Sequence, residues 1–366
     1  MKRKTIKRIA VNTGGGDAPG LNAVISSVVM AADKLGWEIY GINEGYTGLI
    51  DGKGIRRLRP KDVQYISHLG GTILGTTNKG NPFQVPGVID GEIVMKDVSK
   101  QVVRNFKKHK FDALIAIGGD GSLNIAQKLV ELGMPIVGVP KTIDNDISGT
   151  STTFGFATAV SVATEAIDRL HSTAKAHDRV MVVEVMGRNA GWIALYAGIA
   201  SQAHIILIPE IDFKLENVYA KIKSRYKKRD GYAIVVVSEG AKPYGFKNEF
   251  HIKRSGSLRL GGVGEFMETQ IYEATGKETR SLVLGHLLRG GTPCSQDRVL
   301  ALRFGAAAVR AVADGKSGCM VALRPPNIIE VPLKNAISKL KTVPLKGDLI
   351  QTVRDMGICL GDAKVV

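Results

Sequence analysis

The sequence predicts an α/β fold with two similar doubly wound lobes, each built on a mainly parallel sheet. Short apolar runs, such as residues 111–117 and 135–139, alternate with longer segments that have the periodicity of amphipathic helices. Most of these runs end in glycines or polar residues, which is typical of the turn that joins a strand to the next helix in a parallel sheet. The strands are too numerous for one small sheet, and the chain of 366 residues suffices for two hydrophobic cores.

The boundary between the lobes is expected near residue 150. No low-complexity linker divides the chain there, so we expect the chain to cross between the lobes more than once. The predicted lobes are therefore residues 1–150, rejoined by part of residues 268–318, and residues 151–366. Ligands of such sheets bind beyond the carboxyl ends of the strands, and we expect the active site in the cleft between the lobes.

The first lobe begins with two strands and their glycine-rich connections. The elements expected in order are a strand at 7–13, a glycine turn at 14–20, a helix at 21–35, a strand at 37–42, and glycine-containing loops at 43–60 and 70–80. The last of these loops is expected to reach the same sheet edge as the glycine turn. There its hydroxyl, amide and ammonium groups would be available to a nucleotide.

Two glycine and aspartate segments organise this lobe: GGDGS at residues 118–122 and PKTIDND at residues 140–146. A glycine turn between a strand and a helix presents backbone N–H groups to an anion, and we expect Ser122 to cap the helix that follows. Neighbouring parallel strands bring the aspartates of both segments to one edge of the sheet. A phosphate cradle that faces carboxylates suits metal-assisted phosphoryl transfer, although each segment alone is equally consistent with a structural turn.

The second half of the chain repeats the alternation of strands and helices. The elements expected are helices at 157–177 and 296–314, strands at 179–186, 204–208, 232–237 and 319–323, a polar loop at 246–257, and a partly amphipathic tail from residue 334. Polar or glycine clusters again follow the strands, at residues 187–191, 238–240 and 289–291.

The composition limits the classes of partner. A net charge of +16 is compatible with nucleic acid, a membrane surface or small anionic substrates, but the densest basic run, residues 221–229, is interpreted as a solvated helix face. No apolar run approaches the length of a membrane span, and the sequence shows no signal peptide. Three cysteines without metal-ligand spacing predict reduced thiols. Taken together, these features lead us to expect a cytoplasmic protein with no nucleic-acid or membrane partner.

Six motifs in order closely resemble those of the 6-phosphofructokinase family. They are GGDAPGLN at 15–22, GGDGS at 118–122, PKTIDND at 140–146, EVMGR at 184–188, SEG at 238–240 and LGHLLRGG at 284–291. One motif alone is weak, because GGDG also occurs in NAD kinases and lipid kinases. The six together cover nearly the whole chain. The resemblance implies transfer of a phosphoryl group from ATP-Mg to the 1-hydroxyl of D-fructose 6-phosphate, which gives fructose 1,6-bisphosphate in glycolysis.

On this resemblance the first lobe binds the phosphoryl donor, and the second lobe, with the C-terminal tail, binds fructose 6-phosphate. The implied donor-binding residues are Gly15, Gly16, Asn78, Lys79, Gly119, Asp120, Gly121 and Ser122. Gly16 and Gly121 would let donor phosphates approach backbone N–H groups that stabilise the transferring group. Asp120 would hold Mg²⁺ between the donor phosphates.

The resemblance also implies the acceptor site. Asp144 would take the proton of the 1-hydroxyl. The other two implied catalytic residues are Thr142, which would position the sugar and the transferring phosphoryl group, and Gly16, which would let the donor phosphates approach the backbone. The implied sugar-phosphate ligands are Thr142, Ile143, Asp144, Arg179, Met186, Gly187, Arg188, Glu239, Arg280, His286, Leu287, Leu288 and Arg289. Arg179 and Arg280 look like the family's arginines that reach the site from a neighbouring subunit. This implies a homodimer or homotetramer with shared active sites.

Departures from the family pattern bear on the donor and on regulation. Lys141 stands where nucleotide-specific bacterial members carry glycine, whereas Gly121 is their small residue and not the aspartate of typical pyrophosphate users. An open Gly121 admits an α-phosphate, so we expect ATP as the donor. Asn78 and Lys79 replace an arginine that contacts the nucleotide in relatives. The helix at 21–35 has no arginine, so we do not expect regulation by nucleotide effectors there.

Three other functions stay open at this point. A pyrophosphate-dependent fructose 6-phosphate 1-phosphotransferase differs only in its donor. An NAD or lipid kinase shares residues 118–122 but leaves Arg188, Glu239 and residues 286–289 without a role. A basic nucleic-acid binder rests only on the net charge and predicts a steep salt dependence of duplex binding.

Overall fold

The chain forms two compact units in the computed structural model, which describes residues 6–89, 92–227, 231–254 and 257–362. Unit 1 comprises Met1–Thr142, Ile147–Gly155 and Gly290–Leu340, and unit 2 comprises Ile143–Asp146, Phe156–Arg289 and Lys341–Val366. The chain thus passes between the units more than once. The segment that returns to unit 1, Gly290–Leu340, begins within the expected range 268–318 and extends beyond it. It contains a helix that packs on the first sheet and two strands that join that sheet.

Unit 1 is built on an eight-stranded sheet that is parallel except at its edges. Its strands in spatial order are β16 (Asn327–Pro332), β15 (Cys319–Arg324), β7 (Ile136–Thr142), β6 (Ala113–Gly118), β1 (Arg8–Gly14), β2 (Glu38–Ile42) and β3 (Ile55–Leu58), with β8 (Phe154–Gly155) beside β7. The edge strands β16 and β3 are antiparallel to their neighbours. The register places Gly14 beside Gly118, and Gly118 beside Pro140, so β1 and β6 end together and β7 extends two residues further.

Helices cover both faces of this sheet because both alternating sets of residues in its central strands are apolar. In β6, Ile115 and Ile117 belong to one hydrophobic core, whereas Leu114 and Ala116 belong to the other, and all four are buried. Two of the helices that contribute to the second core are α3 (Ser99–Lys108) and α4 (Asp120–Glu131).

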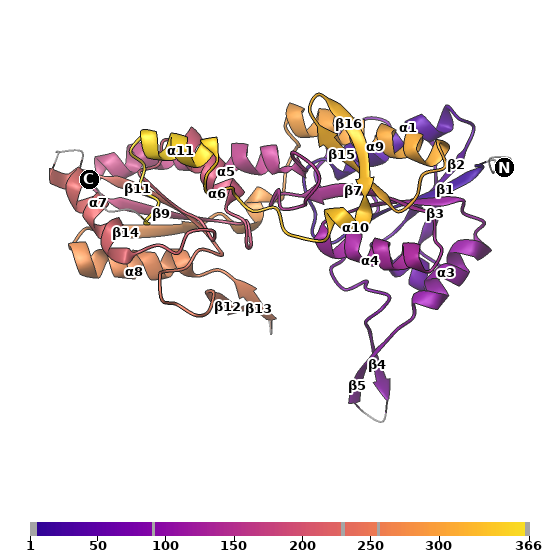
Figure 1. The fold of residues 1–366 in the computed structure, drawn as a ribbon, viewed down its shortest axis with the longest axis horizontal. Coiled ribbons are helices and arrows are strands. Elements are labelled where there is room, and N and C mark those ends of the chain that lie inside the picture. The colour runs from indigo at the N-terminus through magenta and orange to yellow at the C-terminus, as the bar shows by residue number, and fades with distance from the viewer. Residues whose placement is uncertain (1–5, 90–91, 228–230, 255–256, 363–366) are drawn as a thin grey trace. The chain divides into compact units, whose positions relative to one another are not determined.

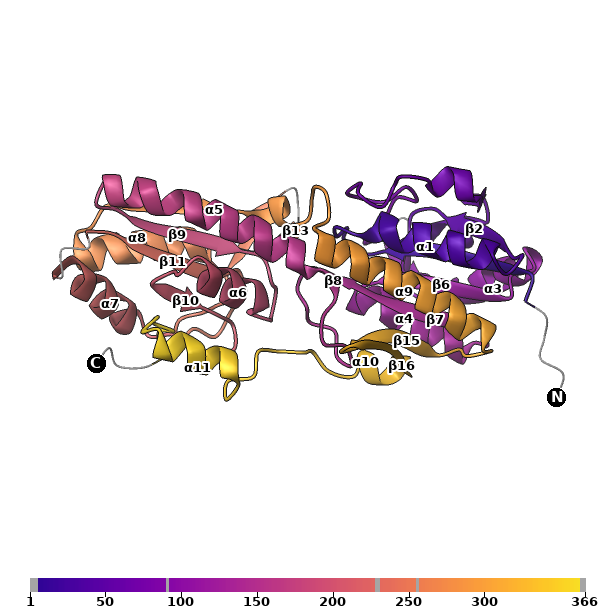
Figure 2. The ribbon, with the colours of Figure 1, turned by 90° about the horizontal axis from the view of Figure 1, so that it is seen from above.

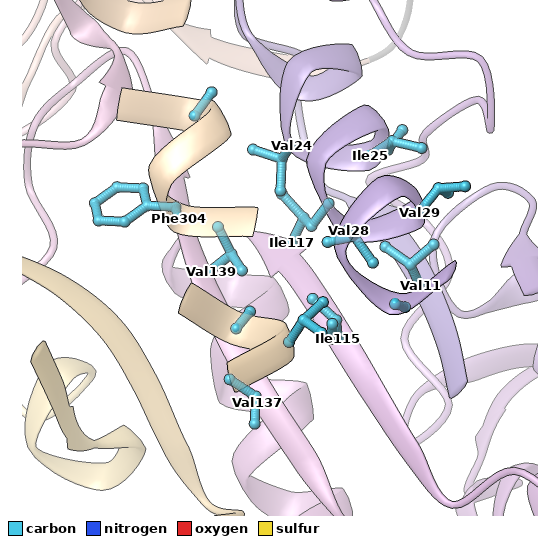
Figure 3. Packing of buried hydrophobic residues seen from close by; sticks show 14 of the residues in the cluster. Val11, Val24, Ile25, Val28, Val29, Ile115, Ile117, Val137, Val139 and Phe304 are labelled. Carbon is cyan, nitrogen blue, oxygen red and sulfur yellow. The ribbon is translucent and has the colours of Figure 1, made fainter. Parts of the chain in front are cut away.

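The first core lies beneath two helices that are distant in sequence. α1 (Leu21–Asp33) and α9 (Ser295–Ala313) run side by side over the sheet (Figure 2). Val28 of α1 and Phe304 of α9 are fully buried against the strand residues Ile115, Val137 and their neighbours (Figure 3). Burial of each such side chain contributes roughly 1.5–3 kcal/mol, which explains why the segment that contains α9 returns to unit 1.

Shorter elements complete unit 1. They are α2 (Thr47–Asp51), the 3₁₀ helix η1 (Pro60–Val63), α10 (Leu333–Ala336), and a hairpin of β4 (Val85–Ile89) and β5 (Glu92–Lys96). The hairpin projects from the rest of unit 1 (Figure 1). The prediction of a loop at 43–60 is therefore wrong, since this stretch contains α2 and β3.

Unit 2 has a smaller, fully parallel sheet. Its strands in spatial order are β10 (Ile205–Leu207), β11 (Ala233–Ser238), β9 (Val180–Val185) and β14 (Thr279–Val283). The surrounding helices are α5 (Phe156–Ala176), α6 (Trp192–Ala200), α7 (Leu215–Lys227), α8 (Val263–Thr275) and α11 (Asp348–Asp355). The predicted α/β class with mainly parallel sheets is confirmed.

Two further predictions for unit 2 can be compared with the structure. Residues 246–257, expected as a polar loop, include β12 (His251–Arg254), which pairs with β13 (Ser257–Leu260). The basic run lies largely on α7, where Lys221 Nζ donates a hydrogen bond to Gly357 O at 2.6 Å. The end of that run falls outside the described residues. Cys294, Cys319 and Cys359 form no disulfide in the described parts of the chain. No helix there has the length and apolarity of a membrane span.

Candidate active site

Ser122 fills the space between the two glycine turns of unit 1. A Cβ atom at Gly14 would lie 2.6 Å from Ser122 Oγ, and one at Gly118 would lie 2.3 Å from Ser122 Cβ. Only glycine fits at these two positions, because atoms in a close-packed interior cannot approach so closely. The prediction that Ser122 caps the helix is wrong. Helix α4 begins at Asp120, with Gly119 at the N-cap position, so Ser122 lies inside the first turn.

Polar side chains converge on Gly15. A Cβ atom there would lie 3.4 Å from Ser122 Oγ, 3.5 Å from Lys141 Nζ and 4.0 Å from Asn78 Oδ1. The φ angle of Gly15 is 80°, a left-handed conformation that favours glycine. The structure therefore brings together three of the predicted donor-binding residues, Gly15, Asn78 and Ser122, and the predicted specificity residue Lys141.

The loop at 70–80 reaches this edge of the sheet, as predicted. Gly15 N–H donates to Thr77 O at 3.2 Å, and Thr13 Oγ1 donates to Gly75 O at 2.8 Å. The buried side chain of Asn22, in the first motif, also binds the loop by accepting the N–H of Ile73 at 2.8 Å. These bonds fix the place of Asn78 and Lys79, whose side chains are exposed.

Lys141 supplies a positive charge within the same cluster. Its side chain is almost fully buried, at 3% exposure, and its Nζ donates a hydrogen bond to the carbonyl oxygen of Gly16. A Cβ atom at Gly119 would lie 3.8 Å from this Nζ, so the ammonium lies close to both glycine turns. A buried ammonium beside backbone N–H groups makes this a site for an anion.

Asp120 and Gly121 form the open side of the cluster. The Asp120 carboxylate is exposed, and its Oδ1 accepts a hydrogen bond from Asn124 Nδ2 at 3.0 Å. Within the described residues no three His, Cys, Asp or Glu side chains gather as a metal site. One carboxylate still fits Mg²⁺, which is usually held by one or two carboxylates together with substrate phosphates. A Cβ atom at Gly121 would meet no atom within 4 Å, so the space beside it is open.

In unit 2 the predicted sugar-site residues follow three strands that end side by side. The register pairs Glu184 of β9 with Val237 of β11 and Val283 of β14. Residues 186–188 and Glu239 follow these ends directly. The third end leads into residues 285–289. This last stretch is the 3₁₀ helix η2 (Gly285–Leu288) and Arg289, in which His286 and Leu287 are exposed and Leu288 is buried.

Glu239 holds the turn that carries Arg188. Its Oε1 accepts the N–H groups of Arg188 at 3.0 Å and Gly187 at 3.4 Å. Arg188 has a φ of 51°, and a Cβ atom at Gly240 would lie 2.0 Å from Arg188 O. Burial raises the pKa of Glu239 to about 7, the charge of Asp144 adds to this rise, and the two N–H groups oppose it.

The segment Ile143–Asp146 belongs to unit 2, whereas Thr142 belongs to unit 1. Asp144 and Asn145 are both about 4% exposed, and Asn145 has a left-handed φ of 54°. The negative charge of Asp144 raises the pKa of Glu239, so these two carboxyl groups are close enough to interact electrostatically.

Arg179 and Arg280 lie at the amino-terminal ends of the unit 2 strands, opposite to the ends that carry the other sugar-site residues. Arg179 precedes β9 and Arg280 is the second residue of β14, and both form ion pairs with Glu278, at 2.9 Å and 2.8 Å. The length of β9 separates Arg179 from the turn at Arg188, which is about 20 Å at the usual rise of a strand. Within one chain the structure therefore does not bring these arginines to the other sugar-site residues.

Two polar residues that the sequence left without a role lie next to the predicted site. Glu184, a lone charge in the apolar strand β9, is buried and accepts the N–H of Gly264 at 2.8 Å and of Gly262 at 3.1 Å. The sequence could have indicated the structural role of Glu184, because a single charged residue in an otherwise apolar strand is unusual. Lys341 donates to Asn145 Oδ1 at 2.7 Å, and nothing local in the sequence indicates this contact.

Comparison with known proteins gives consistent results. A family model described as phosphofructokinase matches residues 8–312. The chain is 51% identical over 356 residues to the ATP-dependent 6-phosphofructokinase of Chloroflexus aurantiacus, covering 97% of this chain and 98% of that protein. It is also 51% identical over 342 residues to the pyrophosphate–fructose 6-phosphate 1-phosphotransferase of Amycolatopsis methanolica, covering 92% and 96%.

A solved structure shows the same fold. The phosphofructokinase of Saccharomyces cerevisiae matches 96% of this chain with a TM-score of 0.78 and 30% sequence identity. This chain spans about half of that yeast chain, or 47% of its length.

Glu239 should make the stability of the chain depend on pH in the neutral range. The pKa of Glu239 is about 7 when folded and about 4.5 otherwise, so the folded state holds the proton more tightly. Its contribution to stability is present below about pH 4.5 and is lost as the pH rises through 7. Glu239→Gln should therefore gain up to about 3 kcal/mol over the parent between about pH 5 and pH 8. Urea unfolding measures this, with the exposed Glu92→Gln as control, and a pH-independent difference would contradict it.

Proposed function

The chain belongs to the phosphofructokinase family, and we propose that it transfers a phosphoryl group from ATP-Mg to the 1-hydroxyl of D-fructose 6-phosphate, giving fructose 1,6-bisphosphate. The observation that carries the proposal is the cluster around Gly15. There, Ser122 packs against two glycine turns, and the buried ammonium of Lys141 lies beside them. Bare backbone N–H groups next to a fixed positive charge suit the phosphates of a donor.

The donor is assigned to residues of unit 1. Gly16, Gly119 and the first turn of α4 would bind its phosphates through backbone N–H groups, as at other helix N-termini. Gly15, whose own N–H donates to Thr77 O, would leave room for the phosphates because it has no side chain. Asp120 would hold Mg²⁺, which neutralises charge that develops on the phosphates during transfer. Asn78 and Lys79, on the loop tied to Gly15, would contact the rest of the nucleotide.

The acceptor is assigned to residues of unit 2. The exposed side chains of Arg188 and His286, together with Arg289, would bind the 6-phosphate through charge-assisted hydrogen bonds. Glu239 would accept a hydroxyl of the sugar, and its bond to the Arg188 turn would keep both groups in register. Asp144 would accept the proton of the 1-hydroxyl as the phosphoryl group is transferred.

The open space beside Gly121 favours ATP over pyrophosphate. An aspartate at this position would place bulk and negative charge where an α-phosphate must lie, whereas glycine leaves the space free. Lys141 attracts the phosphates of either donor and therefore does not discriminate between them. Relatives named for ATP and for pyrophosphate are equally similar to this chain, so overall identity does not decide the donor.

Replacing Asp144 by asparagine should remove most of the activity without changing the fold. The substitution keeps the shape of the side chain and removes only its capacity to accept a proton. General-base catalysis contributes about 10²–10⁴-fold, so we expect kcat to fall by that factor while the fructose 6-phosphate KM changes little. Steady-state kinetics measures both, and a kcat within about twofold of the parent would remove Asp144 from this role.

Assays of fructose 6-phosphate turnover with saturating Mg-ATP or pyrophosphate test the donor. We expect faster turnover with ATP. Gly121→Asp should abolish the use of ATP, because a carboxylate beside a phosphate costs several kcal/mol in a partly desolvated site, on the order of a 10²-fold loss or more. Gly121→Ala, which meets no atom within 4 Å, is the matched control and should retain ATP activity. Faster turnover of the parent with pyrophosphate would overturn the assignment.

The placement of Arg179 and Arg280 can be tested with mixed oligomers. We propose that these arginines bind the 6-phosphate held by the other chain of a homo-oligomer. Arg179→Ala should then mainly raise the sugar-phosphate KM. Mixing Arg179→Ala chains with Asp144→Asn chains should restore part of the activity, because a hybrid contains sites that are intact. Confirmed hybrids that show no recovery would mean that each chain builds its own site.

A further inference from the structure

Lys341 contacts the loop that carries Asp144 at two points. Its backbone N–H donates to Asp146 O at 2.8 Å, and its Nζ donates to Asn145 Oδ1 at 2.7 Å. Asn145 has a left-handed φ of 54°, which non-glycine residues adopt at a cost, although asparagine pays less than most. The two bonds therefore hold a backbone conformation that does not follow from local preference alone.

Lys341 is in turn attached to the body of unit 2. Its carbonyl oxygen accepts the Nε1–H of Trp192 at 2.8 Å, and its Nζ lies 5.7 Å from the centre of a Trp192 ring. Two residues later, the N–H of Val343 donates to Glu210 Oε1 at 2.8 Å, and the same carboxylate accepts the N–H of Gly191 at 3.0 Å. Residues 341–343 thus connect the Asp144 loop with the segment that follows the Arg188 turn.

The ammonium of Lys341 is costly at this position. Burial lowers the pKa of Lys341 to about 8, and the negative charge of Asp146 opposes this shift. An apolar side chain of the same length would fill the space without the loss of hydration. Compared with an apolar side chain, the ammonium adds the hydrogen bond to Asn145, the contact with the Trp192 ring and a positive charge that interacts with Asp146.

We propose that Lys341 is a positioning residue that holds the loop of residues 144–146 in the conformation that orients the Asp144 carboxylate for proton transfer. Lys341 acts through Asn145 and Asp146 and not on the substrate. This inference rests on the proposed role of Asp144. It assigns a catalytic consequence to the C-terminal segment of unit 2, which the sequence left without one.

The substitution Lys341→Met tests the proposal, because it keeps the length of the side chain and removes its charge and donors. A small misplacement of a catalytic group can cost about 10²-fold, so we expect kcat to fall about 10- to 100-fold with the fructose 6-phosphate KM within about twofold. The matched control is Lys346→Met, an exposed lysine of the same segment, which should leave kcat unchanged. A variant that changes only KM, or only the melting temperature, would overturn the proposal.

A double-mutant cycle tests whether Lys341 acts through Asn145. Asn145→Gly removes the side chain and still permits the left-handed backbone. If Lys341 acts on Asp144 through its hydrogen bond to Asn145, Lys341→Met should have little further effect once that bond is lost. In the Asn145→Gly background it should then lower kcat by less than about threefold, far less than in the parent. Fully additive losses in kcat would show that the two residues act independently and would overturn the proposed route.

Amide hydrogen exchange gives a readout that does not depend on activity. In Lys341→Met, peptides that cover residues 143–149 should exchange faster than in the parent, while peptides from β11 should not change. Unchanged exchange in the loop, or faster exchange throughout unit 2, would contradict a positioning role. If the parent phosphorylates fructose 6-phosphate with neither donor, the proposed function fails, and the exchange experiment still decides whether Lys341 holds the loop.

Discussion

The parallel register that places Gly14 beside Gly118, and Gly118 beside Pro140, determines what unit 1 can bind. These three neighbouring strands deliver two glycine turns and a lysine to one short stretch of the sheet. Ser122 packs so closely against Gly14 and Gly118 that a side chain at either position would collide with it. The backbone N–H groups stay uncovered for a steric reason, and the same packing fixes the start of α4. An anion site at this edge follows from the geometry of the sheet before any specific ligand is considered.

In unit 2 a buried carboxylate holds the turn after a strand, whereas in unit 1 close packing by Ser122 holds the glycine turns. The turn after β9 has two residues with positive φ, and Glu239 compensates by accepting the N–H groups of Gly187 and Arg188. Burial of this carboxyl group has an electrostatic cost, because it raises the pKa of Glu239 to about 7 although the two N–H groups oppose the rise. If Glu239 accepts a sugar hydroxyl as proposed, substrate binding would be linked to the stability of this turn through the protonation of this carboxyl group. Glu184 likewise accepts the N–H groups of Gly262 and Gly264 at the start of α8. Two buried acidic side chains therefore hold the backbone turns near the carboxyl ends of the unit 2 strands.

Local sequence signals predicted the glycine turns well, because a strand, a glycine pair and a helix are read from neighbouring residues. They also placed Asp120 and Glu239 just after the ends of strands, where the structure has them. They failed where distant segments decide the outcome. The return of Gly290–Leu340 to unit 1 depends on apolar packing between helices far apart in sequence, and the contact of Lys341 with Asn145 spans 196 positions. No periodicity encodes such contacts.

The discrimination between donors illustrates how charge and space contribute differently at one site. On the proposed assignment, the ammonium of Lys141 would attract any chain of phosphates and so add affinity without selecting a donor. Selection requires a feature that one donor tolerates and the other does not. Gly121 would be such a feature, because its open side leaves room for the larger donor and an aspartate there would exclude it. A larger space does not by itself reject the smaller donor, so the proposed preference for ATP also requires contacts that pyrophosphate cannot make. We assign these contacts to the exposed side chains of Asn78 and Lys79, on the loop tied to Gly15.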